Sequence, residues 1–448
     1  MIQKRNLWTH AITAACCIVF SSYGPGAEAA ANPGAFPLKD GDTWVMVGDS
    51  ITAQHLHSNY IEAFCYARFP QWTFRFRNSG VGGDNVARAL ARFDGDVAPW
   101  KPTVVSVELG MNGEMGGAAG FITNMTILAE RIRAVGARPV YLTSSPVNSG
   151  QGPTAGPHGL ATFASNLNAF ATEQKAPFAD QYNILVGLWA SNKPIENLHR
   201  LAGDIQKTVE IQKDVPGRDL LAQWTNIWAG SEMQSRGASL GGDPVHPGPV
   251  GQLTMCAVML QELKAPGLVS SATLDSSGKV VEQVQCRVSN ASAENNGKLS
   301  FDRQDDCLPM PIPDEARGAL IVYPSIADLS RWLLKITGLK PGSYRVEIDG
   351  TPVATVSADE LDKGWNMGTL AKGPVADQCR EIMKLVAEKE NLVSRWRGRS
   401  KEIAMAKTPD KELQASLDEI MKQILEADAK IREAARPKSR HFTVTPAE

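Results

Sequence analysis

A serine and a histidine in this chain stand in settings that favour nucleophilic chemistry. Ser50 lies in Gly48–Thr52 (GDSIT), directly after an apolar run, where a strand is expected to turn into a helix. A serine at such a turn lies beside the N–H groups that begin the helix, and its own N–H could stabilise an oxyanion. Further along, Asp243 precedes His246 by three residues. This offset lets the carboxylate bond one imidazole nitrogen while the other nitrogen faces the serine, an arrangement that activates a hydroxyl for attack on a carbonyl.

Two further segments could supply hydrogen-bond donors to the same site. The stretch 78–85 (NSGVGGDN) contains glycines, which allow a close approach of the backbone to a ligand and offer an unobstructed N–H. Asn112, in the stretch 110–114 (GMNGE), brings a side-chain amide after another apolar run. Each segment alone also fits a plainer role, such as a helix cap, a surface turn or a phosphate loop without the usual spacing. Their occurrence together, in this order, favours a catalytic site.

The four segments resemble the sequence blocks of the SGNH/GDSL hydrolase superfamily, over roughly residues 42–265. The resemblance implies Ser50 as the nucleophile, His246 as the general base and later acid, and Asp243 as the residue that orients the histidine. It also implies an oxyanion hole formed by the N–H groups of Ser50 and Gly83 and the side-chain amide of Asn112. The chemistry would need no metal and no organic cofactor.

One position departs from the family pattern. Family members commonly carry aspartate directly after the third-block asparagine, whereas here Gly113 follows Asn112 and Glu114 comes next. Because that carboxylate usually supports the loop, the geometry of Asn112 is left open. Asp49, beside the serine, is expected to support its turn by hydrogen bonding rather than to act as an acid.

The elements that must position these residues are short apolar runs alternating with amphipathic segments. This alternation predicts an α/β domain with a parallel sheet covered on both faces, in which ligands bind beyond the carboxyl ends of the strands. The resemblance implies a three-layer α/β/α, flavodoxin-like arrangement. The expected strands are 44–47, 73–77, 103–109, 139–143 and 177–179, and the expected helices are 60–69, 86–93, 121–135, 160–173 and 249–263.

The chain divides into four parts. Residues 1–29 combine a short basic segment, an apolar run and small residues at 27–29, which predicts a cleaved signal peptide and a secreted or periplasmic protein; a buried helix is the alternative. Residues 30–266 form the predicted hydrolase domain. Residues 267–373 are expected to form a β-rich accessory domain with strands at 280–288, 319–322, 332–336 and 344–348. Residues 374–448 are expected to form a C-terminal helical hairpin and tail.

The composition argues against two classes of interaction, nucleic-acid binding and membrane spanning. The 46 Lys+Arg and 48 Asp+Glu give a net charge of −2, which argues against a nucleic-acid partner, and no apolar run is long enough for a membrane span. In the accessory domain, Cys286 and Cys307 are the favoured disulfide among the cysteines outside the predicted signal peptide.

For the accessory domain we favour structural support over glycan binding. For the hairpin we favour a brace against the first domain over a dimerisation device, and its basic cluster 395–399 could meet an anion or only solvent. The oligomeric state is left open.

The substrate is the least determined property. Trp189, Trp224 and Trp228 could stack on sugar rings or pack in a core, and His55 and His57 could line a pocket or face solvent. Secretion and a near-neutral charge fit a soluble ester better than bulk lipid, and the resemblance points towards carbohydrate deacetylation. We therefore predict a secreted serine esterase that hydrolyses short-chain acyl esters, above all acetyl esters, of a small molecule or polysaccharide. The alternatives are a lipase- or thioesterase-type acylhydrolase, and a non-catalytic glycan-binding protein built on a decayed hydrolase domain.

Overall fold

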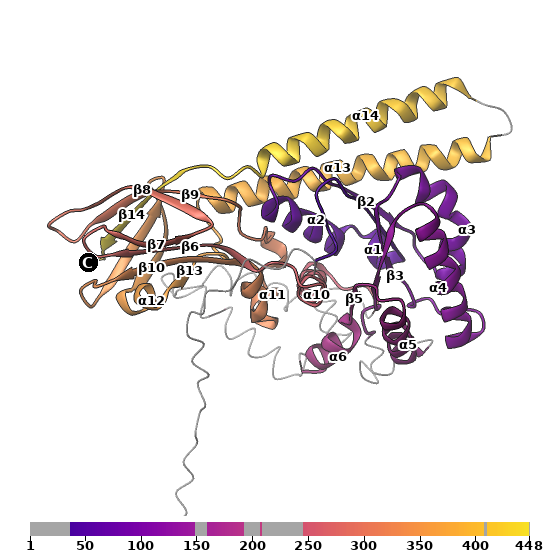
Figure 1. The fold of residues 1–448 in the computed structure, drawn as a ribbon, viewed down its shortest axis with the longest axis horizontal. Coiled ribbons are helices and arrows are strands. Elements are labelled where there is room, and N and C mark those ends of the chain that lie inside the picture. Colours follow the sequence, from indigo (N-terminus) through magenta and orange to yellow (C-terminus); the bar gives the residue numbers. More distant parts are fainter. Residues whose placement is uncertain (1–35, 148–158, 192–206, 208–244, 407–409, 448) are drawn as a thin grey trace, which may run out of the picture. The chain divides into compact units, whose positions relative to one another are not determined.

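The first sheet is parallel and buried on both faces (Figure 1). The computed structural model describes residues 36–147, 159–191, 207, 245–406 and 410–447. The sheet consists of β1 Thr43–Gly48, β2 Arg75–Gly80, β3 Val104–Glu108, β4 Arg138–Leu142 and β5 Phe178–Ala179. The strand order is β2-β1-β3-β4-β5 and all neighbours are parallel. This is the flavodoxin-like order, whose switch point lies between β1 and β3.

Helices cover both faces of this sheet, so the prediction of a three-layer α/β/α domain is confirmed. The side chains of β1 alternate between two cores: Trp44 and Met46 pack with α2 and α10, whereas Val45 and Val47 pack with α3, α4 and most of α5. Every residue of β1 and β3 is buried, as expected for central strands of a covered parallel sheet. The helices are α1 Ser50–Ala53, α2 Leu56–Arg68, α3 Val86–Asp96, η1 Ala98–Trp100, α4 Gly117–Ala134, α5 Leu160–Glu173, α6 Gln181–Ser191 and α10 Pro249–Glu262.

Two further sheets form the β-rich accessory region. One has the order β13-β10-β6-β7 and the other β12-β11-β14-β9-β8. Trp332 on β10 meets Phe442 on β14 edge to face at 6.1 Å between ring centroids, so the two sheets share a core. The strands are β6 Leu268–Asp275, β7 Val280–Val284, β8 Cys286–Ala293, β9 Leu299–Asp305, β10 Arg331–Thr337, β11 Ser343–Ile348, β12 Thr351–Ser357, β13 Trp365–Asn366 and β14 Arg440–Pro446. Its short helices are η3 Asp314–Ala316, α11 Ala319–Val322, η4 Pro324–Ser330 and α12 Ala358–Lys363.

Two expectations for this region were wrong. The run 319–322 is the helix α11 rather than a strand, because four apolar residues carry no periodicity that separates the two. The thiols of Cys286 and Cys307 are free. Each thiol donates a hydrogen bond to a different backbone carbonyl: Cys286 Sγ to Ser271 O at 3.2 Å, and Cys307 Sγ to Val269 O at 3.4 Å.

The helical hairpin contributes to the core of the first α/β domain. It consists of α13 Pro374–Met405 and α14 Lys411–Ala434. Trp396 lies 4.0 Å from Trp100 between ring centroids, and Val393 belongs to the same buried cluster as Val45. These contacts match the interpretation of the hairpin as a brace. Among the described residues, no helix is both long enough and apolar enough to cross a membrane.

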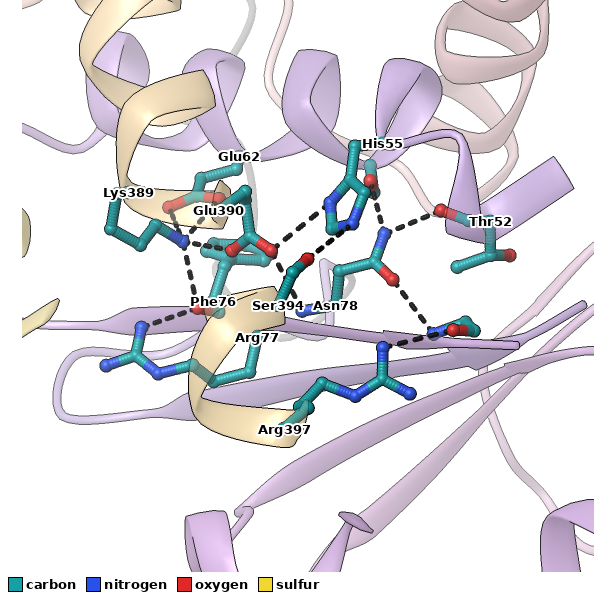
Figure 2. Close-up of polar contacts among 12 residues, drawn as sticks. Thr52, His55, Glu62, Phe76, Arg77, Asn78, Lys389, Glu390, Ser394 and Arg397 are labelled. Atoms are coloured by element: carbon teal, nitrogen blue, oxygen red, sulfur yellow. Dashed lines mark hydrogen bonds and ion pairs between the residues drawn. The ribbon is translucent and has the colours of Figure 1, made fainter. Parts of the chain in front are cut away.

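A buried ion cluster joins α13 to α2 and β2 (Figure 2). The side chain of Lys389 is completely buried; its Nζ lies 2.7 Å from Glu62 Oε1, pairs with Glu390 and donates to Phe76 O at 3.0 Å. The two carboxylates share one ammonium group. Burial raises the pKa of Glu62 to about 8. Burial acts in the same direction on Glu390, but the charges and hydrogen bonds of Lys389 and His55 together outweigh it and lower the pKa of Glu390 to about 2. The cluster therefore places one strong negative charge, that of Glu390, against the end of β2.

Candidate active site

Ser50 occupies the sharp turn between β1 and α1. It is the first residue of α1, so its N–H is one of the donors that a helix leaves without an intrahelical partner. Asp49 caps the helix, and its Oδ1 accepts the N–H of Ile51 at 2.9 Å, which agrees with the predicted supporting role. A Cβ at position 48 would lie 2.0 Å from Thr52 Oγ1, so only glycine allows the strand to meet the helix this closely. The turn thus presents a hydroxyl and a backbone N–H at the carboxyl end of the sheet.

The imidazole of His246 meets this serine. His246 Nε2 and Ser50 Oγ are 2.7 Å apart, although the two residues are 196 positions apart in the chain. His246 lies just before α10, whose first residue is Pro249. A histidine nitrogen at this distance can take the hydroxyl proton and return it to a leaving group. Asp243 lies outside the described residues, as do Trp224, Trp228 and the side chain of Trp189.

The Gly83 loop and Asn112 lie together beside β2. Gly83 has a φ of 75°, the left-handed region that favours glycine. Asn112 Nδ2 donates to the carbonyl of Asp84, the next residue, at 2.9 Å. One of the two amide N–H groups is therefore used to hold the side chain against the loop, and by valence the amide carries a second donor. The structure thus places the Asn112 side chain against the residue that follows Gly83.

Glu114 takes over the support that Gly113 cannot give. Its Oε2 accepts the N–H of Val86 at 2.9 Å at the start of α3, and its Oε1 accepts from Asn124 Nδ2 at 3.0 Å. A carboxylate at a helix N-terminus is stabilised by the unpaired N–H groups there. Because α3 begins directly after the Gly83 loop, Glu114 ties the Asn112 segment to that loop. The sequence suggested only the missing aspartate and not this substitute one position later.

A buried polar layer lies behind the serine. Glu108, at the end of β3, has Oε2 3.0 Å from His57 Nε2 and accepts from Thr52 Oγ1 at 3.1 Å, while its Oε1 accepts from Gln181 Nε2 at 2.7 Å. His57 is 2% exposed, so it neither faces solvent nor lines an open pocket. Burial by itself lowers the pKa of His57, but the charge and hydrogen bond of Glu108, together with the hydrogen bond to Gln252 and the charge of Asp49, outweigh burial and leave that pKa raised.

The same layer acts on Asp49. Burial first, and the Glu108 charge second, raise the pKa of Asp49 to about 7. This carboxyl group is therefore half-ionised near neutral pH, one residue from the serine. Neither Glu108 nor its link to His57 was found from the sequence, because nothing in the sequence marks Glu108 as a partner of a histidine on another element.

The chain is similar to a known family and to known proteins. Residues 46–252 match the GDSL-like Lipase/Acylhydrolase family. The chain is 29% identical over 140 residues to "Esterase TesA" of Pseudomonas aeruginosa, a match that covers 30% of this chain and 67% of that protein. A solved structure described as "BT4096 a gut microbial diltiazem-metabolizing enzyme" shares the fold, with a TM-score of 0.69 and 21% identity, over 92% of this chain and 99% of the other. The protein is a carboxylic ester hydrolase, and its residues 46–252 are similar to the GDSL-like lipase/acylhydrolase family.

Proposed function

We propose that this protein is a serine esterase in which Ser50 is the nucleophile and His246 the general base. The observation that carries the proposal is the 2.7 Å contact between His246 Nε2 and Ser50 Oγ. In the first step the Ser50 oxygen attacks the ester carbonyl carbon while His246 accepts the hydroxyl proton. His246 then protonates the departing alcohol, and the acyl group stays on the serine. A water molecule, deprotonated by His246, attacks this acyl-enzyme and releases the acid.

The negative oxygen of each tetrahedral intermediate would be held by three donors. These are the N–H groups of Ser50 and Gly83 and the second N–H of the Asn112 amide. The support for this assignment is the position of Ser50 at the start of α1 and the hydrogen bond from Asn112 to the residue after Gly83. Asp243 would orient His246 through the other ring nitrogen and stabilise the imidazolium.

The substrate we propose is a short-chain acyl ester, above all an acetyl ester, carried by a carbohydrate. The support is chemical: a net charge of −2 provides no steering towards an anionic lipid surface, and the signal-like segment 1–29 favours export to where polysaccharides are met. The relative in fold that is described as metabolising diltiazem makes a small-molecule ester the second candidate.

An ester series with paired variants tests these proposals. Wild-type protein should hydrolyse p-nitrophenyl acetate faster than the octanoate or palmitate ester and release acetate from acetylated xylan. Ser50→Ala and His246→Ala should each lose at least about 10³-fold in kcat, and Asp243→Asn should lose activity through the orientation of His246. Ser277→Ala, at an exposed turn of the accessory region, is the matched control and should keep the wild-type rate.

Two results would contradict the assignment. Equal rates in wild type and Ser50→Ala would exclude Ser50 as the nucleophile. Binding of acetylated glycans without hydrolysis of any ester would favour the decayed, glycan-binding alternative. A preference for palmitate over acetate would keep the mechanism and replace the substrate class.

A further inference from the structure

One face of α13 lies against the strand end that leads into the Gly83 loop (Figure 2). Glu390, Ser394 and Arg397 are spaced by four and three residues, so they share one side of the helix. Glu390 Oε2 accepts the N–H of Asn78 at 3.3 Å, and Arg397 Nη1 donates to the carbonyl of Gly80 at 3.0 Å. Helix α13 therefore binds the backbone of β2 at two points, Asn78 and Gly80, the first and the last of its final three residues.

The same face also holds the junction between α1 and α2. His55, the residue just before α2, has Nδ1 3.4 Å from Glu390 Oε2 and Nε2 3.2 Å from Ser394 Oγ. His55 has a φ of 59°, an uncommon conformation for a residue with a side chain. A residue held in this region needs support from its surroundings, and the two contacts from α13 supply it five residues after Ser50.

From Arg397 a chain of ion pairs runs to the loop itself. Arg397 Nε and Nη2 donate to the two carboxylate oxygens of Asp96, each at 2.6 Å. Asp96 also accepts from Arg92 Nη1 at 2.6 Å, and Arg92 Nε donates to Asp84 Oδ2 at 2.6 Å. Asp84 is the residue after Gly83, and its carbonyl holds Asn112. The chain of ion pairs thus ends on Asp84, which is adjacent to Gly83 in sequence and hydrogen-bonded to Asn112.

The side chain of Arg397 is largely buried against Asp96 rather than exposed to solvent. Its side chain is 14% exposed and that of Asp96 is 16% exposed. Burial alone would raise the pKa of Asp96, but the hydrogen bonds and charge of Arg397, together with the charge of Arg92, outweigh burial and lower that pKa, which keeps the carboxylate ionised. A planar guanidinium can bind a carboxylate with two N–H groups and a carbonyl with a third, which a lysine cannot do.

Gly80, which accepts the hydrogen bond from Arg397, also packs against α1, the helix that begins with Ser50. A Cβ at this position would lie 2.5 Å from the backbone nitrogen of Ala53 in α1, so the end of β2 packs directly on the serine helix. Asn78 reinforces this packing, because its Nδ2 donates to Thr52 O at 2.7 Å and its Oδ1 accepts the N–H of Gly80 at 2.8 Å. A shift of the β2 end would therefore move the loop relative to Ser50.

We propose that Arg397 is a positioning residue for the oxyanion hole: through Gly80 and the Asp96–Arg92–Asp84 chain it fixes the loop 81–85 at its distance from Ser50. The hairpin thereby completes the active site of the first domain from more than 300 residues further along the chain, as the separation of 317 between Arg397 and Gly80 records. The inference rests on the proposed function, since it assigns a task to the loop that the proposed mechanism uses.

The test compares Arg397→Ala and Arg397→Lys with Arg399→Ala. Arg399 is the matched control, because it lies on the same helix, is 44% exposed and, among the residues that the structure describes, forms its ion pair locally with Glu402. With p-nitrophenyl acetate, Arg397→Ala should lower kcat by about 10- to 100-fold while KM changes by less than about twofold, because a loosened oxyanion hole weakens the transition state more than the bound ester. Arg397→Lys should lie between the alanine variant and wild type, and Arg399→Ala should match wild type.

Binding of phenylboronic acid separates positioning from general weakening of the fold. The Ser50 oxygen would bond to boron as its proton passes to His246, giving a tetrahedral anion that occupies the oxyanion hole. Its Ki should rise in Arg397→Ala by the same factor as kcat falls. Thermal unfolding, recorded for each variant, shows whether the protein is folded at the assay temperature, and a purely structural role would leave kcat and Ki unchanged in the folded fraction.

The possible failures are distinguishable. Wild-type kcat and Ki in folded Arg397→Ala, with Ser50→Ala inactive, would overturn the positioning role and leave the proposed function intact. An active Ser50→Ala would instead overturn the proposed function. If Arg397→Ala does not fold, Asp96→Asn and Arg397→Lys decide, because each weakens the ion-pair chain and keeps the bulk of the contact; a kcat like that of wild type in both would overturn the inference.

Discussion

Asp49 is a buried carboxyl group whose ionisation should weaken the fold near neutral pH. Its side chain accepts the Ile51 N–H at the Ser50 turn, and the residue is 2% exposed. Burial, followed by the charge of Glu108, raises its pKa from the ordinary 3.8 to about 7. The folded state therefore holds the proton more tightly than the unfolded chain does. The contribution of Asp49 to stability is fully present below its unfolded pKa and is lost as the pH rises through the folded value.

The size of the effect follows from the width of this window. One pKa unit corresponds to about 1.36 kcal/mol, so the two units between about pH 5 and the folded pKa near 7 correspond to about 2.7 kcal/mol. Asp49→Asn keeps an oxygen for the Ile51 N–H and has no proton to lose. The unfolding free energy of wild type minus that of Asp49→Asn should therefore fall by about 2.7 kcal/mol between about pH 5 and about pH 8.

Urea unfolding followed by tryptophan fluorescence at several pH values measures this difference. Taking the difference removes the groups that titrate equally in both proteins. The exposed Asp362→Asn is the control and should unfold in parallel with wild type at every pH. Parallel curves for wild type and Asp49→Asn, or a difference that grows with pH, would mean that Asp49 does not bind its proton more tightly in the folded state than in the unfolded chain.

Three further changes test the packing around the site. Lys389→Met removes the ammonium that two buried carboxylates share and should lower the unfolding free energy by about 3–5 kcal/mol in urea titrations; the exposed Lys384→Met should have little effect. Gly80→Ala adds a methyl group against the α1 backbone and should lower the unfolding free energy by about 1–3 kcal/mol and reduce kcat. Gly95→Ala is its control: the added methyl group meets open space in α3 and should raise the unfolding free energy by about 0.5–1 kcal/mol. Glu114→Ala removes the carboxylate at the α3 N-terminus and should cost about 1 kcal/mol in thermal unfolding and lower kcat in the ester assay.

Contrary results would identify which reason is wrong. A Lys389→Met protein as stable as wild type would mean that the buried carboxylates are neutral without their partner. Full activity in Gly80→Ala would mean that the end of β2 can move without moving the loop. Full activity in Glu114→Ala would mean that Asn112 holds its orientation without the carboxylate.

The parts of the fold that could be predicted are those encoded within a short stretch of sequence. The apolar runs of the first sheet identified its strands because each run is short, buried and followed by a helical pattern. The Ser50 turn and the Gly83 loop were found for the same reason, since a strand end followed by a helix start is a local signal. By contrast, the run 319–322 was misassigned because four residues are too few for a period to show.

The parts that could not be predicted depend on contacts between distant residues. Lys389 and Glu62 are 327 positions apart, and no property of either stretch indicates the other. The strand β14, Arg440–Pro446, was missed because its alternation of polar and apolar residues is short and only partly buried. It also lies among prolines and charged residues, which are typical of a tail. The link from Arg397 to Gly80 is of the same kind, because a basic cluster on a helix looks solvated until its acceptors are known.

The place of β14 also sets an order of events during synthesis. This strand pairs with β11 on one side and β9 on the other, and it is made after the whole helical hairpin. Until the ribosome has delivered it, β9 and β11 each present an open edge, and open edges are where chains pair with the wrong partner. The parallel sheet of the first domain, by contrast, has all its strands once residue 179 has emerged. A nascent chain halted before Arg440 would therefore not lack a dispensable tail; it would carry a sheet split down its middle.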